Sequence, residues 1–387
     1  MDLLYGIRGL FRGERQRADL EQDMKEYFGV THVFCVNSGK TALTLILLAL
    51  QELSPKKEVV LPAYTCFSVP SAVLRAGLRP KLCDIDETTF DFKIDQLNQT
   101  IGVDTLCVIP GHLFGIPSDL DRIQAICKPK GVVLVEDAAQ AMGGHRKERL
   151  LGTIGDVGFY SLGRGKTITC GEGGVIVTDS DAIARAIAHH YAILAAPGMW
   201  NSLIDLLKTF LMMLLIRPSL YWIPASVPML KLGQTFFHKD FPMARLSGAN
   251  AGLMVFWRDR LKQSLEGRAN VSKFFQEGLQ TLGVSARSLA YLRLPLMAES
   301  RRRRDELFSE SRTQGLGLSL MYPSTLNDLD EVREKNEQFP GAQAVADRLI
   351  AIPTHQYVSP QDRKTICDLV VPKVDRKQVE TFQSAET

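Results

Sequence analysis

The sequence has almost no net charge and no paired-cysteine pattern, and each lack excludes a class of protein. Its 387 residues hold 46 Lys and Arg against 43 Asp and Glu, which leaves a formal net charge of +3. That balance gives no support for nucleic-acid binding. The seven cysteines are odd in number and no two form a C-x-x-C pair, so neither a disulfide framework nor a zinc site is expected. A reducing, cytoplasmic compartment fits this cysteine usage.

Long uninterrupted apolar runs are also lacking. The N-terminus has neither the apolar core nor the small-residue cleavage site of a signal peptide. The most apolar segment, 203–216 (LIDLLKTFLMMLLI), is interrupted by Asp205 and Lys208 and ended by Arg217 and Pro218. It falls short of the ~18 apolar residues that a membrane-spanning helix needs. Packing in the core or a dimer interface is its first interpretation, and a helix lying on a membrane surface is the second.

The first half of the chain alternates short β-rich runs with helical stretches. This alternation predicts an α/β domain built on a mostly parallel sheet. One of its helices, 41–53, is apolar nearly all round and is therefore expected to be buried. The expected strands are 33–36, 58–61, 80–84, 105–109, 132–135, 158–161 and 175–178, and two further helices are 67–76 and 118–128.

The second half predicts helices and then a smaller α+β domain. Residues 181–290 are expected to be helical, with a charged amphipathic stretch at 256–282. The predicted domains are 1–245, which includes an apolar helical insertion at about 199–241, and 246–387. The four-arginine run 301–304, followed by two acids, predicts a solvated helix face. In the smaller domain we expect strands at 291–296 and 349–352 and helices at 297–314 and 359–369.

Two carboxylates, Glu136 and Asp137, follow the apolar strand at 132–135. In open α/β sheets, ligands bind beyond the carboxyl ends of the strands. Asp137 is therefore a candidate functional residue. A carboxylate that caps the next stretch of backbone is an equally good interpretation when the motif is taken alone.

Lys166 lies in a loop rich in glycine that follows the strand at 158–161. Glycines on both sides let the backbone approach a ligand closely. The alternative is a solvated loop lysine. The sequence GKT at 165–167, and again at 39–41, resembles the end of a nucleotide-binding P-loop. That loop needs an earlier glycine where this chain has Tyr160 and Phe34, so neither segment is one.

The segment 37–41 (NSGKT) opens the helix predicted at 41–53. A helix start with free N–H groups and a positive dipole end is suited to a phosphate. A simple Ser38 N-cap is the structural alternative. Together the three motifs provide a phosphate cradle, an acid at a strand end and a loop lysine. A pyridoxal phosphate enzyme requires these parts, because a lysine forms its Schiff base and an Asp pairs with the pyridinium nitrogen.

These motifs resemble the DegT/DnrJ/StrS family of sugar aminotransferases, a fold-type-I group, over most of the chain. The most specific pair is Glu-Asp-Ala-Ala-Gln at 136–140 and the serine, lysine and Gly-Glu-Gly-Gly signature between 161 and 174. Further matching stretches are 37–39, 61–65, 84–86, 111–115, 155–156, 339–342 and 353–355.

The resemblance implies a fold-type-I aminotransferase-like architecture, bound pyridoxal 5'-phosphate and a homodimer with a shared active site. By position, Lys166 would be the Schiff-base lysine and catalytic proton carrier, with Asp137 on the pyridine nitrogen as the second catalytic residue. Gln140 would contact the phenolic oxygen of the ring. The full set implied to bind the cofactor is Gly39, Lys40, Thr41, Asp137, Gln140, Ser161 and Lys166.

The resemblance also implies the reaction, which is transfer of an amino group, with glutamate as the expected donor, to a small-molecule keto-sugar. The acceptor would be nucleotide-linked and would serve polysaccharide or glycoconjugate biosynthesis. The alternatives are other fold-type-I chemistry and a cofactor-binding protein that works at a membrane surface. Sugar dehydratases of the family replace the lysine with His, so Lys166 argues against that reaction.

Three departures from the family pattern concern the site. Lys40 stands where the family often has Thr, and could meet the phosphate by charge. Cys66 stands where an aromatic residue usually stacks on the cofactor, and Tyr64 or Phe67 is a possible substitute. The apolar stretch 199–241 replaces a partner-contact segment that is rich in Gly, Tyr, Asn and Arg.

Overall fold

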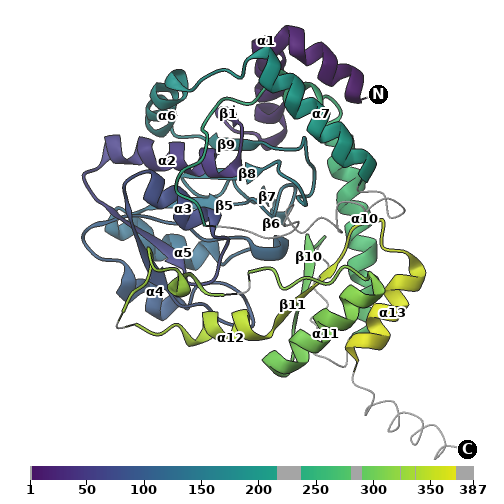
Figure 1. Ribbon diagram of the computed structural model, residues 1–387. Helices are drawn as coiled ribbons and strands as arrows, with labels where there is room; N and C mark the ends of the chain where they lie inside the picture. The colour runs from purple at the N-terminus through teal and green to yellow at the C-terminus, as the bar shows by residue number, and fades with distance from the viewer. Residues whose placement is uncertain (1, 216–236, 280–289, 323, 336, 372–387) are drawn as a thin grey trace, which may run out of the picture. The chain divides into compact units, whose positions relative to one another are not determined.

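The computed structural model describes residues 2–215, 237–279, 290–322, 324–335 and 337–371 (Figure 1). Contacts divide the chain into two compact units. The first holds Met1–Lys262 and Tyr322–Ala346, and the second holds Gln263–Met321 and Asp347–Thr387. This division into compact units does not coincide with the expected domain boundary after residue 245. The domain boundary stays a prediction.

A seven-stranded sheet in the order β1-β9-β8-β5-β4-β2-β3 forms the centre of the first unit. The five strands from β8 to β3 run parallel to their neighbours, while β9 runs antiparallel to both β8 and β1. The predicted α/β class and mostly parallel sheet are therefore confirmed. The strands are β1 His32–Val36, β2 Glu58–Pro62, β3 Arg79–Cys83, β4 Thr105–Val108, β5 Val133–Asp137, β8 Val157–Ser161 and β9 Gly174–Thr178.

The central strands are buried along nearly their whole length, as in β4 and β9. Strands covered on both faces are expected to be continuously apolar rather than alternating. Helix α2 (Gly39–Leu53) packs against β1, β8 and β9 and buries residues on every side, as predicted. The other helices beside this sheet are α3 Ser68–Arg75, α4 Ile94–Thr100, α5 Leu120–Cys127 and α6 Asp181–Ile193, and a small hairpin pairs β6 His145–Arg146 with β7 Arg149–Leu150.

An N-terminal helix that the sequence did not predict, α1 (Asp2–Phe28), packs against α9 (Gly248–Gly252). Glycines permit the contact, since a Cβ on Gly9 would lie 2.0 Å from the carbonyl oxygen of Gly248. The first part of the apolar stretch forms α7 (Met199–Leu215), and residues 216–236 lie outside the described residues. Among the described residues, no helix has the length and apolar character needed to cross a membrane.

The second unit pairs β10 (Arg293–Met297) with β11 (Leu349–Pro353) in antiparallel fashion. Its helices are the C-terminal part of α10 (Trp257–Gly278), α11 (Arg301–Gln314) and α13 (Pro360–Val370). The arginine run lies on α11, but it is not wholly solvated. Arg302 is 90% exposed, whereas the side chain of Arg304 is 5% exposed and pairs with Asp305. The prediction of a solvated face is therefore wrong for Arg304.

Helix α12 (Pro340–Arg348) begins in the first unit, although its sequence motif was expected in the smaller domain. The buried carboxylate of Asp84 explains this placement. It accepts hydrogen bonds from the N–H groups of Gly341 (3.0 Å) and Ala342 (2.8 Å) at the start of α12. A carboxylate stabilises a helix start because it accepts hydrogen bonds from the free N–H groups there. Its negative charge also interacts favourably with the positive end of the helix dipole.

Candidate active site

The start of α2 lies directly against the end of β8. A Cβ built on Gly39 would fall 3.2 Å from the Cβ of Ser161 and 3.4 Å from its hydroxyl oxygen. The Ser161 hydroxyl also accepts a hydrogen bond from the N–H of Gly163 at 3.3 Å. The fold thus brings a hydroxyl group to the first turn of a helix, where N–H groups and the dipole attract anions.

Ser38 caps α2, which was the structural interpretation of the segment 37–41. Its hydroxyl accepts the N–H of Thr41 at 3.1 Å, and the Thr41 hydroxyl donates to the side chain of Asn37 at 2.7 Å. The polar groups of Thr41 are therefore directed into the cap. Gly39 and Lys40, the first two residues of α2, have no helical carbonyl before them for their N–H groups. They are the amides best suited to an anion.

Gly174 holds the antiparallel strand β9 against this helix start. It is paired with Val36 on one side and Ser161 on the other. A Cβ at this position would lie 2.3 Å from the carbonyl oxygen of Ser38 and 2.8 Å from the amide nitrogen of Gly39. Only glycine permits this approach of backbone to backbone, which gives a physical reason for the last glycine of the Gly-Glu-Gly-Gly signature.

Asp137 ends β5, opposite Phe159 of β8, and one carboxylate oxygen accepts the N–H of Ala139 at 3.0 Å. Burial raises the pKa of Asp137, while the Ala139 hydrogen bond and the positive charge of Lys166 act against that rise. Lys166 is therefore near enough to Asp137 for its charge to be felt, although 29 residues separate them in sequence. An ionised Asp137 is costly here unless a cation lies beside it.

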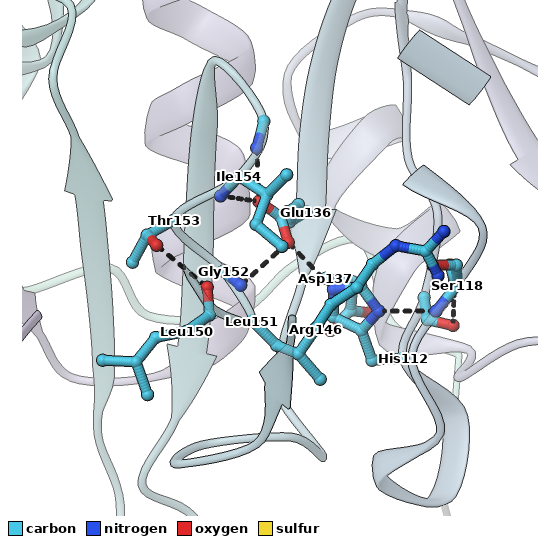
Figure 2. Close-up of polar contacts among 12 residues, drawn as sticks. His112, Ser118, Glu136, Asp137, Arg146, Leu150, Leu151, Gly152, Thr153 and Ile154 are labelled. Carbon is cyan, nitrogen blue, oxygen red and sulfur yellow. Dashed lines mark hydrogen bonds and ion pairs between the residues drawn. The ribbon is translucent and has the colours of Figure 1, made fainter. Parts of the chain in front are cut away.

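Glu136, the residue before Asp137, lies in a buried network that the sequence did not reveal (Figure 2). Its carboxylate has no exposed surface and accepts hydrogen bonds from His112 Nε2 (3.0 Å) and from the amide of Gly152 (2.8 Å). The amides of Ile154 and Gly155 donate to its other oxygen. Burial favours protonation, but the hydrogen bonds from His112, Gly155 and Gly152 outweigh it and lower the pKa of Glu136.

The orientation of His112 follows from the same network. Its Nδ1 accepts the N–H of Ser118 at 3.1 Å, so its Nε2 carries the proton that is donated to Glu136 (Figure 2). Glu136 therefore ties β5 to two loops that are distant in sequence. The role of Glu136 in this structure is to position backbone, so Asp137 is the candidate catalytic carboxylate of the pair.

Gln140 is buried and both ends of its amide have protein partners. Its oxygen accepts the N–H of Phe114 at 3.0 Å, and its nitrogen donates to the hydroxyl of Tyr322 at 2.8 Å. The Tyr322 ring lies 5.5 Å from the ring of Tyr64 and 6.3 Å from that of Phe67. Both aromatic substitutes considered from the sequence therefore pack around Tyr322, a residue that the sequence did not identify.

Lys40 is half-buried beside the aromatic ring of Phe241, with 4.6 Å between Nζ and the ring centroid. Burial lowers the pKa of Lys40, and the negative charges available to Cys66 and Glu172 act in the opposite direction. A cation–π contact of this kind holds an ammonium group in place. Phe241 ends the apolar stretch that was expected to be an insertion.

The structure thus gathers the predicted site residues into two groups. Gly39, Lys40 and Thr41 lie at the start of α2 beside Ser161, which is the phosphate-cradle group. Asp137 and Lys166 interact by charge. Burial raises the pKa of Tyr322, the partner of Gln140, and the charge of Asp137 adds to that rise. The seven residues come from β5, β8, the start of α2 and the loops that follow the two strands.

Comparison with known proteins shows the family to which the chain belongs. The family model for the DegT/DnrJ/EryC1/StrS aminotransferase family matches residues 8–205 and 233–371. The chain belongs to this family. The crystal structure of the sugar aminotransferase CalS13 from Micromonospora echinospora covers 92% of this chain and 91% of its own, with a TM-score of 0.73 and 22% identity. That likeness confirms the fold.

Two relatives of this family member match over shorter stretches. GDP-perosamine synthase of Caulobacter vibrioides is 34% identical over 166 residues, which are 43% of this chain and 44% of that protein. UDP-N-acetyl-3-dehydro-alpha-D-glucosamine 3-aminotransferase of Acidithiobacillus ferrooxidans is 34% identical over 176 residues, or 45% and 47%. The matched stretches thus span less than half the length of these relatives.

Proposed function

We propose that this member of the DegT/DnrJ/EryC1/StrS family is a pyridoxal-phosphate-dependent aminotransferase that acts on a keto-sugar. Two observations carry the proposal: Lys166 lies within charge range of Asp137, and the Ser161 hydroxyl faces the first turn of α2. A phosphorylated cofactor with a basic ring nitrogen fits both groups. When bound, pyridoxal phosphate supplies an aldehyde that takes up amino groups and a ring that withdraws electrons.

The phosphate-cradle group binds the cofactor by its phosphate. The Ser161 hydroxyl and the amides of Gly39 and Lys40 provide hydrogen bonds, and the α2 dipole adds to them. The Lys40 ammonium, held over Phe241, adds a positive charge at the same end of the helix. Thr41 contributes indirectly, because its side chain fixes the cap that orients this turn.

Asp137 and Lys166 carry the chemistry. Asp137 would pair with the ring nitrogen, and its carboxylate would keep that nitrogen protonated. Lys166 would hold the cofactor through its amine and, when that amine is free, would move the proton as general base. Gln140, which is hydrogen-bonded to Tyr322, would orient the ring.

The substrate class is inferred from the relatives. Two of them bear the names of enzymes that act on nucleotide sugars, one with GDP and one with UDP. We propose a nucleotide-linked keto-sugar as acceptor and glutamate as amino donor. We also propose a homodimer that shares its active sites, as the family resemblance implies.

The test uses Lys166→Ala, with Lys128→Ala as the control because Lys128 is an exposed lysine at the end of α5. Purified parent protein is expected to absorb visible light after addition of pyridoxal phosphate and to convert glutamate to 2-oxoglutarate in a half-reaction. Lys166→Ala is expected to lose both the absorbance and at least about 100-fold of the rate, since general-base and covalent roles are each worth that much. If Lys166→Ala keeps the parental rate, the assignment of Lys166 is wrong.

A further inference from the structure

Helix α7 has an apolar face that points away from the protein. Ser202 and Leu206 are buried on its inner side, and a Cβ on Gly6 of α1 would lie 2.8 Å from Leu206. The opposite side repeats at helical spacing over three turns and is exposed. It consists of Trp200 (76% exposed), Leu203 (42%), Ile204 (46%), Leu207 (63%) and Leu211 (53%). This pattern is the reverse of a solvated surface helix, whose outer side is polar.

Helix α1 contacts α7 (Figure 1) and carries a second exposed apolar stripe of its own. Its Gly6 and Gly9 face α7 and α9, and its opposite side exposes Leu4 (69%), Ile7 (42%) and Phe11 (75%). We call the exposed apolar residues of α1 and α7 together the two-helix face. Exposed apolar stripes on two neighbouring helices are typical of an interaction site.

The charges beside the stripe on α1 are basic. Arg8, Arg12 and Arg15 are exposed on the side next to Leu4 and Phe11. Within the described residues these three arginines form no ion pair. The neighbouring acid Glu14 does, with Arg17 (3.6 Å) and Arg245 (3.5 Å). The two-helix face therefore combines an apolar surface with cations that have no counter-charge in the part of the chain that the structure describes.

We propose that the two-helix face docks on the surface of an anionic membrane. An apolar stripe that enters the interface, an exposed Trp and a basic flank are the features of helices that lie on such surfaces. A second copy of the chain fits less well. In a twofold contact the same patch meets itself, so the basic side of α1 would be brought against a second basic side.

Docking would place the catalytic region close to the membrane. The inner side of α7 packs on the Gly-Glu-Gly-Gly loop, since a Cβ on Gly171 would lie 2.4 Å from the hydroxyl oxygen of Thr209. The loop that follows Lys166 thus lies under the docked helix. The docking itself does not depend on the proposed aminotransferase reaction. Flotation can therefore disprove the docking while the glutamate half-reaction still supports the proposed function, and the reverse.

The experiment is flotation of the full-length protein with vesicles of phosphatidylcholine alone or with about one-third phosphatidylglycerol. The parent is expected to float with anionic vesicles and to release as salt is raised, because screening weakens surface electrostatics. Leu207→Glu with Leu211→Glu is expected to abolish flotation. Arg8→Gln with Arg15→Gln is expected to weaken binding to anionic vesicles about 25-fold, at roughly fivefold for each basic residue near the surface.

Val103→Glu is the matched control, because Val103 is 96% exposed and lies on the loop before β4. It is expected to float like the parent. Thermal unfolding and the glutamate half-reaction are measured on every variant and are expected to be unchanged. The proposal is overturned if the parent protein does not float with anionic vesicles. It is also overturned if the Leu207→Glu, Leu211→Glu variant still floats. Light scattering that shows this variant to be monomeric where the parent is a dimer overturns it as well, since the face would then bind a second copy.

Discussion

Gly174→Ala tests whether the backbone contact between β9 and the start of α2 shapes the phosphate cradle. The added Cβ would lie 2.3 Å from the Ser38 carbonyl oxygen and 2.5 Å from its carbon, where ordinary contact begins at 3.4 Å. Neither atom belongs to a side chain that could rotate away. The backbone of Ser38 and Gly39 must therefore move by about 1 Å, as the difference between these distances requires.

Such a displacement has two measurable consequences. Overpacking of this kind lowers the free energy of unfolding by about 1–3 kcal/mol. A shift of ~1 Å in a binding group is expected to weaken the interactions it makes by up to about 100-fold. We therefore expect the dissociation constant for pyridoxal phosphate to rise between about 10-fold and 100-fold.

The assay is titration of the protein with pyridoxal phosphate, followed by absorbance, together with urea unfolding monitored by circular dichroism. Gly102→Ala is the control, because a Cβ there has no heavy atom within 4 Å and the backbone has no positive φ. It should leave both quantities unchanged. If Gly174→Ala binds the cofactor as tightly as the parent while Gly102→Ala also does, the close approach at Gly174 has no part in the cradle.

Two further changes test the buried acids. Glu136→Gln puts an amide where four donors converge on a fully buried carboxylate. It should lower the free energy of unfolding by about 3 kcal/mol, as measured by urea titration at neutral pH. Equal stability of variant and parent would contradict this. Because the folded-state pKa of Glu136 is below its ordinary value of 4.5, its contribution is present above pH ~4.5 and is lost as the pH falls through the folded pKa. The parent should therefore lose more stability on acidification than Glu136→Gln does, and parallel curves would exclude this linkage. Asp84→Asn, at the start of α12, should cost about 2 kcal/mol and increase proteolysis near residue 340, whereas the exposed-site change Asp95→Asn should do neither.

The strands of the large unit could be predicted from sequence because they are short, continuous apolar runs. Predicted and observed bounds agree within about two residues for β1, β2 and β8, among others. The same runs could not reveal α1. In its first part the outer side is apolar and the inner side carries Gly6 and Gly9, so a buried apolar stripe begins only at Leu20.

Only the site residues that belong to local sequence motifs could be predicted. Asp137, Ser161 and Lys166 each lie at a strand end or in the loop after one, where the sheet topology places ligand groups. Partners such as His112 for Glu136, or Tyr322 for Gln140, come from segments 24 and 182 residues away. Such pairs depend on the tertiary fold, and a single sequence has no signal for them.

The neighbouring acids Glu136 and Asp137 show how one strand end serves stability and chemistry together. Successive residues of a strand point to opposite sides, so Glu136 turns to the 152–155 loop while Asp137 turns to Lys166. The loop held by Glu136 leads directly into β8, whose last residue is Ser161. Glu136 thus fixes the distance between the strand end that carries the acid and the strand end that carries the phosphate hydroxyl. A change at Glu136 should consequently alter cofactor affinity through geometry, without altering the charge that Asp137 presents to the ring.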